Sequence, residues 1–300
     1  KKNNLTIKVL DTFDQLEDVV VLQMIVWPGS DTDVVPAHLL FTVDLNGGLV
    51  QGAYPDDGDE SQVVGFVFGF PGIYPTPDGP RLKHCSHMMG VHPEFRGRGL
   101  GFQLKRAQWQ VVRKQGIDRI TWTYDPLLSR NAHLNIHRLG AVCNTYQREV
   151  YGEMRDSLNL GVASDRFEVE WWVNSQRVNK RLSSRARPKL DLMHFKAAEA
   201  EIINPAQVNE AGLVVPSDAI DKHYQIRSAD IVPNILLVEI PSDFLALKEA
   251  DITLAKEWRE YTRMLLEELF EKGYLVTDFV YLPGDIPRSY YVLTHGEGTL

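Results

Sequence analysis

The stretch from residue 84 to residue 104 constrains the fold more than any other part of the sequence. It begins as a predicted strand, because Met88, Met89 and Val91 are apolar, and Pro93 ends that strand because proline cannot donate to a sheet ladder. A glycine-rich turn follows. Apolar residues then recur with helical spacing until Gly116, at Leu100, Leu104, Ala107 and Val111. The predicted order is therefore strand, glycine-rich turn and helix.

The glycine-rich turn predicts a site for an anion. Gly97, Gly99 and Gly101 leave backbone N–H groups uncovered at a helix N-terminus, where an anion is favoured. Attraction to a helix end is worth roughly 0.3–1 kcal/mol per charge, so Arg96 and Arg98 would supply much of the remaining affinity. A phosphate or pyrophosphate group is the expected ligand. The alternative is a glycine-rich surface turn with two solvated arginines.

Two familiar phosphate-binding loops are excluded by the residues that follow the glycines. No Gly-Lys-Ser/Thr is present, so the turn is not a nucleoside triphosphate loop. The dinucleotide pattern needs glycine or alanine three residues after its second glycine, and the two registers place Phe102 or Leu104 there. The remaining pattern is Arg-x-x-Gly-x-Gly, which starts at Arg96 and is preceded by Val-His-Pro at residues 91–93.

This pattern resembles the acetyl-CoA signature of the GNAT superfamily of N-acetyltransferases, which have the acyl-CoA N-acyltransferase fold. The resemblance implies that acetyl-CoA is the co-substrate and that the residues which bind it are Met89, Val91, Arg96, Gly97, Arg98, Gly99, Leu100, Gly101 and Asn131. Asn131 matches the asparagine that begins the family's second cofactor-side helix. In the family, a tyrosine four residues before the glycine that closes this helix protonates the departing CoA thiolate. Ile136 stands at that position, which puts the usual general acid in doubt.

The order of elements over roughly residues 5–175 predicts an α+β fold of the α/β/α kind, with a mixed, strongly twisted sheet flanked by helices. This order is strand, two helices, three strands, helix, strand, helix and two strands, which is the order of the resembling family. The expected strands cover residues 6–10, 49–54, 63–70, 84–91, 117–124, 145–151 and 167–173. The expected helices begin after Asp11 or Thr12, at Pro36, at Leu100 and at Asn131.

A basic run at residues 177–189 marks the predicted boundary between a GNAT-like acetyl-CoA-binding domain, residues 1–175, and a C-terminal α+β domain, residues 176–300. We interpret the run as a solvated linker, because no aromatic residue is interleaved as in a nucleic-acid-binding patch. Beyond it, the pattern predicts strands at residues 235–240, 274–282 and 289–294 and a helix at residues 250–272. The segment from Val238 through that helix to Tyr281 parallels residues 90–124. The extension is therefore a degenerate repeat of the core unit or a chance similarity.

The bulk properties of the chain agree with a soluble cytoplasmic enzyme. The 300 residues carry a formal net charge of −8, which argues against nucleic acid as a partner. Two cysteines, Cys85 and Cys143, provide no disulfide framework and no metal-ligand spacing. The sequence also contains no run of roughly 18 apolar residues, so we expect no membrane span. We expect no metal cofactor.

Acetyl transfer to an amine requires a general base close to the predicted strand, and its candidates are His84, Cys85 and His87. The segment from His87 to Arg96 is similar to the arylalkylamine N-acetyltransferases, which carry two strand histidines spaced by two. His87 matches the second, whereas the first falls on Cys85. We therefore predict His87 as the catalytic base; a hydrogen-bonded structural histidine is the alternative. Cys85 is expected to be an inert thiol rather than an acetyl carrier.

The sequence thus predicts an acetyl-CoA-dependent N-acetyltransferase that acts by direct attack of a small-molecule or protein amine. For the general acid, Tyr124, His137 and Tyr146 are candidates, each with a packing role as its alternative, and water is another. The alternative function is a non-catalytic acyl-CoA-binding or regulatory module, in which Ile136 marks lost chemistry. The C-terminal extension would complete the acceptor pocket or form a homodimer interface. The acceptor itself is not defined by the sequence.

Overall fold

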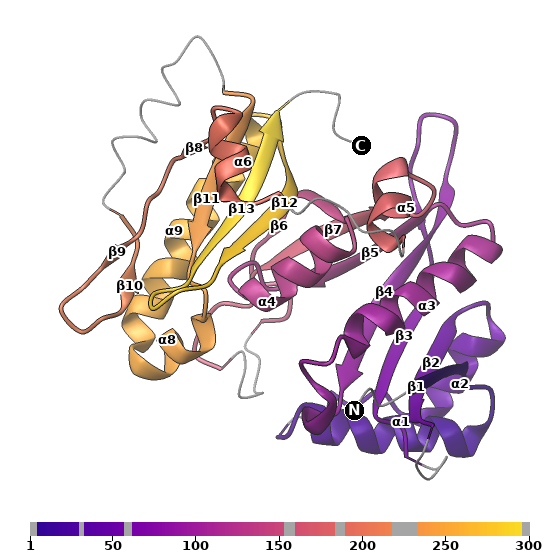
Figure 1. The fold of residues 1–300 in the computed structure, drawn as a ribbon. Coiled ribbons are helices and arrows are strands. Elements are labelled where there is room, and N and C mark those ends of the chain that lie inside the picture. The colour runs from indigo at the N-terminus through magenta and orange to yellow at the C-terminus, as the bar shows by residue number, and fades with distance from the viewer. Residues whose placement is uncertain are drawn as a thin grey trace. The chain divides into compact units, whose positions relative to one another are not determined.

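The structure is a computed structural model that describes residues 5–29, 33–56, 62–152, 160–183, 190–217 and 233–295 (Figure 1). The described chain forms two compact units. The first contains residues 5–122 and 171–174, and the second contains residues 123–152, 160–170 and 175–295. The chain therefore passes between the units within two of its strands. These units are defined by contacts within the folded chain. The predicted division into two folding domains after residue 175 stays a prediction.

The first unit has the element order that the sequence predicts. Its elements are β1 (Leu5–Val9), α1 (Phe13–Val26), α2 (Ala37–Leu45), β2 (Leu49–Pro55), β3 (Gly65–Tyr74), β4 (Arg81–Val91), the short 3₁₀ helix η1 (Pro93–Phe95), α3 (Leu100–Lys114) and the start of β5 (Arg119–Tyr124). The strands follow the order β1-β2-β3-β4-β5. Neighbouring strands are antiparallel except β4 and β5, which are parallel.

Helices cover both faces of this sheet. Side chains alternate between the two faces along each strand, so successive residues of one strand pack against different helices. Phe66 and Phe68 of β3 pack with buried residues of α1 and α2, whereas Val67, which lies between them in sequence, packs with Leu100 and Leu104 of α3. The first unit is thus a three-layer α/β/α arrangement, as predicted.

The second unit is also α+β, and its main sheet is mostly antiparallel. Its elements are the end of β5, α4 (Ser129–Ala132), the π-helix η2 (His133–Arg138), β6 (Val142–Gln147), the larger part of β7 (Arg166–Trp172), α5 (Gln176–Leu182), α6 (Leu192–Ala197), β8 (Glu201–Ile202), β9 (Gln207–Val208), β10 (Val214–Val215), β11 (Ile235–Ile240), α8 (Phe244–Ala250), α9 (Ile252–Glu271), β12 (Tyr274–Leu282) and β13 (Arg288–His295). Six strands follow the order β7-β6-β12-β13-β11-β8. Strands β9 and β10 pair with each other.

Several predicted elements differ from the structure in their bounds, among them two helices and one strand of the second unit. The helix expected from Asn131 begins at Ser129 and continues as a π-helix. The strand expected at residues 145–151 is β6, which begins and ends earlier, at Val142 and Gln147. The helix expected at residues 250–272 is interrupted at Asp251, whose backbone is extended and whose carboxylate caps the new helix α9. An aspartate at such a position favours a helix start over the continuation of the preceding helix.

The basic run is not a solvated linker over its first part. Residues 176–182 form α5, and two of its arginines make buried or half-buried contacts. Arg177 Nε donates to the Gly140 carbonyl oxygen at 3.0 Å, and Arg181 pairs with Asp278 at 2.7 Å. The run of basic residues in the sequence showed the charges of α5, but it did not show the hydrophobic and ionic contacts that this helix makes. Residues 184–189 of the run lie outside the described residues.

The C-terminal extension is not a repeat of the segment from β4 through α3 to β5. Strands β4 and β5 pair directly, whereas β13 lies between β11 and β12 and is antiparallel to both. The interpretation of a degenerate copy of this unit is therefore wrong. The two segments share the succession strand, helix, strand and not the strand order.

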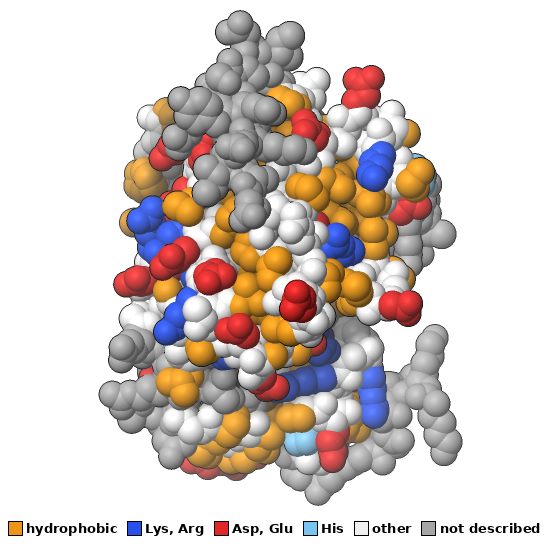
Figure 2. All heavy atoms as spheres, turned by 90° about the vertical axis from the view of Figure 1, so that its left-hand side faces the viewer, with side chains coloured by type: hydrophobic (Ala, Val, Ile, Leu, Met, Phe, Trp, Pro, Cys, Tyr) orange, Lys and Arg blue, Asp and Glu red, His pale blue; other side chains and the backbone are white. Residues whose placement is uncertain are grey.

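Three features of the described chain concern the expected partners: the charges on its surface, the length of its helices and its clusters of possible metal ligands. On the face in Figure 2, acidic and basic side chains are interspersed with hydrophobic ones. None of the helices that the structure describes has the length and apolar character needed to cross a bilayer. Within the described residues, no cluster of three or more His, Cys, Asp or Glu side chains could hold a metal ion.

Candidate functional site

The glycine-rich turn leads into the N-terminus of α3 with an open outer surface. Gly97 and Gly99 have φ values of +77° and +81°, a region that residues with a side chain rarely adopt. No heavy atom lies within 4 Å of the position that a Cβ would take at either glycine. Gln103 N–H donates to the carbonyl oxygen of Gly99, the N-cap, at 3.2 Å, and the preceding N–H groups of the first turn have no partner within the helix. This helix start has the open geometry that the predicted anion site requires, and the site itself stays a prediction.

The two arginines of the turn lie on its exposed surface. Arg96 Nε donates to the carbonyl oxygen of Val91 at 3.1 Å, and the guanidinium carbon of Arg98 lies 5.5 Å from the centre of the Phe95 ring. Leu100 differs from these residues, because its side chain is buried against the sheet. Only its backbone N–H can therefore serve the predicted cofactor role.

Strands β4 and β5 separate halfway along β4, and we call this separation the fork. Their ladder consists of the pairs His84–Ile120 and Cys85–Thr121, and it ends there. His92 N–H donates to the carbonyl oxygen of Val64, the residue just before β3, at 2.9 Å. The peptide groups of successive residues point to alternate sides of a strand, so those of Met89 and Val91 point away from β3. These groups face the side from which β5 has departed. The predicted cofactor contacts at Met89 and Val91 therefore have backbone groups with the required direction.

His87 lies at a bulge in β4. Gly69 pairs with Ser86 and Phe68 pairs with Met88, so His87 is the extra residue between two pairs. Its ring lies 5.8 Å from the rings of Phe68 and Phe70, yet the residue remains exposed. Desolvation of the imidazole lowers the pKa of His87 below its ordinary value of 6.5. The side chain is therefore neutral and accessible at neutral pH, which a general base requires.

The other two base candidates on β4 have different surroundings. His84 is fully buried, and its Nε2 atom lies 3.2 Å from Gln108 Nε2. Burial, with a contribution from Lys105, lowers the pKa of His84 to about 4. Cys85 is half-buried, and its thiol is free of any disulfide. His84 cannot meet an acceptor in this conformation, so only Cys85 and His87 remain within reach of solvent.

Three candidates for the general acid have structural partners in the second unit. The buried hydroxyl of Tyr124 lies 3.1 Å from that of Tyr291, and burial raises its pKa well above 10. Tyr146 donates to Asp165 at 2.8 Å, and burial raises its pKa as well. His137 lies 2.9 Å from Asp278. These contacts favour the packing interpretation for all three.

Asn131 and Ile136 lie on either side of the change from α-helix to π-helix. Asn131 is half-buried in α4, and its N–H donates to the Leu128 carbonyl oxygen at 2.9 Å. Ile136 is fully buried in η2. A π-turn adds one residue to a helical turn, so counting back from Gly140 in steps of an α-helix does not define which side chain faces a ligand.

A buried polar cluster in the first unit was missed from the sequence. Lys105 and Gln108 of α3 contact Ser86 and His84 of β4, and all four side chains are buried. A signal was present in the pattern, because Gln108 follows Leu100 and Leu104 at intervals of four and so occupies a core position.

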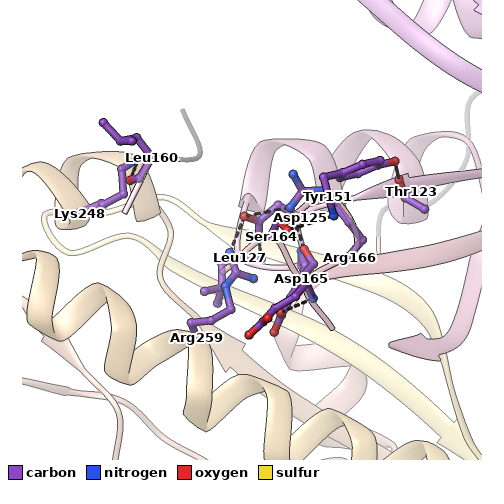
Figure 3. Close-up of polar contacts among 12 residues, drawn as sticks. Thr123, Asp125, Leu127, Tyr151, Leu160, Ser164, Asp165, Arg166, Lys248 and Arg259 are labelled. Atoms are coloured by element: carbon purple, nitrogen blue, oxygen red, sulfur yellow. Dashed lines mark hydrogen bonds and ion pairs between the residues drawn. The ribbon is translucent and has the colours of Figure 1, made fainter. Parts of the chain in front are cut away.

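A second buried cluster, in the second unit, was also missed. Asp125 pairs with Arg259 at 2.5 Å (Figure 3). Asp165 receives two hydrogen bonds from Arg263, at 2.8 and 2.9 Å. Arg166 lies 3.9 Å from Asp125. The residues of this cluster are far apart in sequence, so no local pattern indicated that they meet.

The comparisons with known proteins agree with the resemblance over part of the chain. Residues 22–140 match the model of the acetyltransferase (GNAT) family. This range contains the fork, the bulge at His87 and the glycine-rich turn. No curated protein matches the chain.

Several solved structures are similar to part of the chain. One is the Arabidopsis thaliana acetyltransferase NAA60 in complex with acetyl-CoA, at 15% identity and a TM-score of 0.45, covering 56% of this chain and 99% of that chain. Another is the ribosomal-protein-S18-alanine N-acetyltransferase from Escherichia coli, at 13% identity and a TM-score of 0.44, covering 62% and 100%. A third is yncA, a putative acetyltransferase from Salmonella typhimurium with acetyl-CoA, at 18% identity and a TM-score of 0.41, covering 62% and 99%.

Proposed function

We propose, from the GNAT acetyltransferase domain at residues 22–140, that this chain transfers an acetyl group from acetyl-CoA to an amine. Acetyl-CoA supplies an acetyl group that is activated as a thioester. The residues of the chain would bind the cofactor, orient the acceptor and take up a proton. The acceptor class that we propose is a primary amine of a small molecule or a protein.

The turn and the fork fit the two polar parts of the cofactor. The uncovered N–H groups at the start of α3, with Arg96 and Arg98 beside them, suit a pyrophosphate. The peptide groups of Met89 and Val91 suit the amide-containing arm, because they face away from β3. We propose Asn131 as a further contact on the strength of the family resemblance alone.

His87 is the proposed general base. Its imidazole would accept the proton that the amine loses as the new C–N bond forms and the C–S bond of the thioester breaks. The released thiolate would be protonated by water, because Tyr124, Tyr146 and His137 are engaged in other contacts. The observation that carries the proposal is that one strand, β4, brings together the fork, the bulge at His87 and the glycine-rich turn.

Cofactor binding is tested by the melting temperature of the purified protein with and without acetyl-CoA. Ligand at about 100 times its dissociation constant should add roughly 2.7 kcal/mol to the stability of the native state. Gly99→Trp should abolish the shift by obstructing the turn. Gly79→Trp is the matched control, because Gly79 also has a positive φ, +109°, and open space around it, but lies in the loop between β3 and β4.

Catalysis is tested separately by release of the CoA thiol in a screen of primary amines. With an acceptor found, His87→Ala should lower turnover at neutral pH by about 10²- to 10⁴-fold, the usual contribution of a general base. Its affinity for acetyl-CoA should stay nearly unchanged. A His87→Ala variant with normal turnover would remove His87 from the mechanism. A protein that binds acetyl-CoA and acetylates none of the amines would favour the non-catalytic acyl-CoA-binding module.

A further inference from the structure

Helix α3 contacts the polar side chains of β4 through a buried lysine and a buried glutamine. Lys105 Nζ donates to Ser86 Oγ at 2.7 Å, and Ser86 Oγ donates to Gln108 Oε1 at 2.9 Å. Lys105, Gln108 and Ser86 are only 2%, 0% and 4% exposed. The amine also lies 3.7 Å from the centre of the Trp122 ring of β5. Among the described residues, no carboxylate forms an ion pair with Lys105.

Ser86 occupies the place where β4 has the least support from its neighbouring strands. It directly follows Cys85, the last residue of β4 that pairs with β5. It directly precedes His87, where the register with β3 shifts. A strand that lacks one ladder and is bulged in the other is held by fewer backbone hydrogen bonds than a regular central strand. The contacts from α3 therefore restrain this part of β4 where the sheet does not.

We infer that Lys105 and Gln108 are positioning residues, which hold the Ser86 side chain and thereby fix the bulge that directs the His87 ring onto the Phe68 and Phe70 rings. The inference rests on the proposed function only for the role of His87 as a base. The orientation of His87 is a property of the protein without ligand and can be measured without acetyl-CoA.

A purely space-filling role for Lys105 explains the contacts less well. Burial lowers the pKa of Lys105 to about 7, so the native state bears a cost whenever the amine is charged. A methionine fills similar space without that cost. A methionine could not donate a hydrogen bond to Ser86, however. The hydrogen bond from Lys105 Nζ to the Ser86 hydroxyl is therefore the contact by which Lys105 positions β4.

The test is an NMR titration of the His87 ring in variants that remove or retain this hydrogen bond. The His87 signal is identified among the nine histidines by its absence in His87→Gln. Ser86→Ala and Lys105→Met should each move the His87 pKa upward, toward its ordinary value of 6.5, because the ring is released from Phe68 and Phe70. Ser86→Thr retains the hydroxyl and should restore the parent titration. Lys114→Met, an exposed position on the same helix, is the control and should leave it unchanged.

Amide hydrogen exchange of a peptide covering residues 84–91 provides a second readout. Exchange should accelerate in Ser86→Ala and Lys105→Met and stay at the parent rate in Ser86→Thr. Unchanged His87 titration and exchange in folded Ser86→Ala and Lys105→Met would overturn the inference, and so would a Ser86→Thr variant that behaves like Ser86→Ala. If the titration moves as expected but His87→Ala keeps normal turnover, the positioning is upheld and the catalytic role of His87 fails.

Discussion

Helices α3 and α9 each bury one cation against a sheet, but they surround it differently. Lys105 of α3 and Arg259 of α9 are both 2% exposed. Lys105 contacts the neutral groups of Ser86 and Gln108, and burial lowers its pKa to about 7. Burial also disfavours the charge of Arg259, but the Asp125 carboxylate at 2.5 Å outweighs this and raises its pKa above the usual range. One helix therefore buries a titratable amine, whereas the other buries a permanent ion pair.

The N-termini of the two helices differ in the same sense. The Asp251 carboxylate accepts hydrogen bonds from Thr253 N–H and Leu254 N–H at 2.9 and 3.0 Å, so the start of α9 has its own anion. The N-cap of α3 is Gly99, which has no side chain that could do this. A strand–helix–strand succession therefore does not by itself define a ligand site. The start of α9 is capped by a carboxylate of its own, whereas the N-cap residue of α3 provides none.

The largest expected effect is the loss of the ion pair of α9. Arg259→Met leaves the buried Asp125 carboxylate without its close cationic partner, with Arg166 at 3.9 Å (Figure 3). Breaking a buried pair in this way costs about 3–5 kcal/mol. Chemical denaturation should therefore show a loss of this size, and adding Asp125→Asn should recover part of it.

An exposed pair of the same helix serves as the control for Arg259→Met. Arg148 makes two hydrogen bonds to Glu267, but its side chain is 59% exposed. Arg148→Met should change stability by less than about 1 kcal/mol. Equal losses in the two variants would contradict the contrast between a buried and a solvated pair.

The next effect is a pH dependence that belongs to α3. The folded-state pKa of Lys105 is about 7, against 10.5 for an exposed lysine, so between these values the unfolded state binds more protons. The stability of the parent should therefore rise with pH in this window, and the cost of the buried charge is complete below pH 7. Lys105→Met has no such group. The difference in free energy of unfolding, parent minus Lys105→Met, should therefore increase by on the order of 2–4 kcal/mol between pH 6.5 and pH 10.5.

Lys114→Met separates this effect from the general titration of the chain. Lys114 is exposed in the last turn of α3, so its difference from the parent should be independent of pH over the same range. A flat difference between the parent and Lys105→Met would mean that the buried amine does not change its charge state near neutral pH.

Local patterns predicted the first unit well, because its signals are close together in sequence. The strand before Pro93, the glycines and the helical spacing after Leu100 all lie within about 30 residues, and the structure has each element where it was expected. The fork and the bulge at His87 are different. They depend on the register between β3, β4 and β5, which a single sequence does not contain. His87 was therefore predicted from the resemblance alone, and its role stays a prediction, whereas the contacts of Ser86 and Lys105 were not predicted.

The second unit was harder to predict for the same reason. The bounds of β12 agree with the expected strand, although Thr277 and Asp278 interrupt its apolar residues. Strand β13 lies between β11 and β12, so these two strands are not neighbours as the interpretation of a degenerate repeat required. Asp125 and Arg259 are 134 residues apart, so neither could be recognised as half of an ion pair.

A smaller effect tests the open helix start of α3. Gly99→Asp places a carboxylate at the N-terminus where the cofactor anion is proposed to bind, and aspartate tolerates the positive φ of this position better than most residues. Like-charge repulsion should raise the dissociation constant of acetyl-CoA about tenfold, or 1.4 kcal/mol, in a thermal-shift titration. Gly99→Asn, which carries no charge, should weaken binding less. Gly79→Asp should leave it unchanged, and a similar loss in Gly79→Asp would point to an effect of net charge alone.

The smallest effect tests the closed helix start of α9. Asp251→Ala removes the cap and should lower the free energy of unfolding by about 1 kcal/mol, whereas Asp251→Asn, which still accepts hydrogen bonds, should lose only a few tenths. Neither variant should alter the melting-temperature increment given by acetyl-CoA. Asp251→Gly is the sharper version, because it gives α9 an uncapped start like that of α3. If Asp251→Gly acquired an acetyl-CoA shift that survived Gly99→Trp, an open helix end would be sufficient for binding. We expect no such shift for two reasons. No glycine-rich turn precedes α9. In addition, β13 fills the space between β11 and β12, whereas no strand fills the fork between β4 and β5.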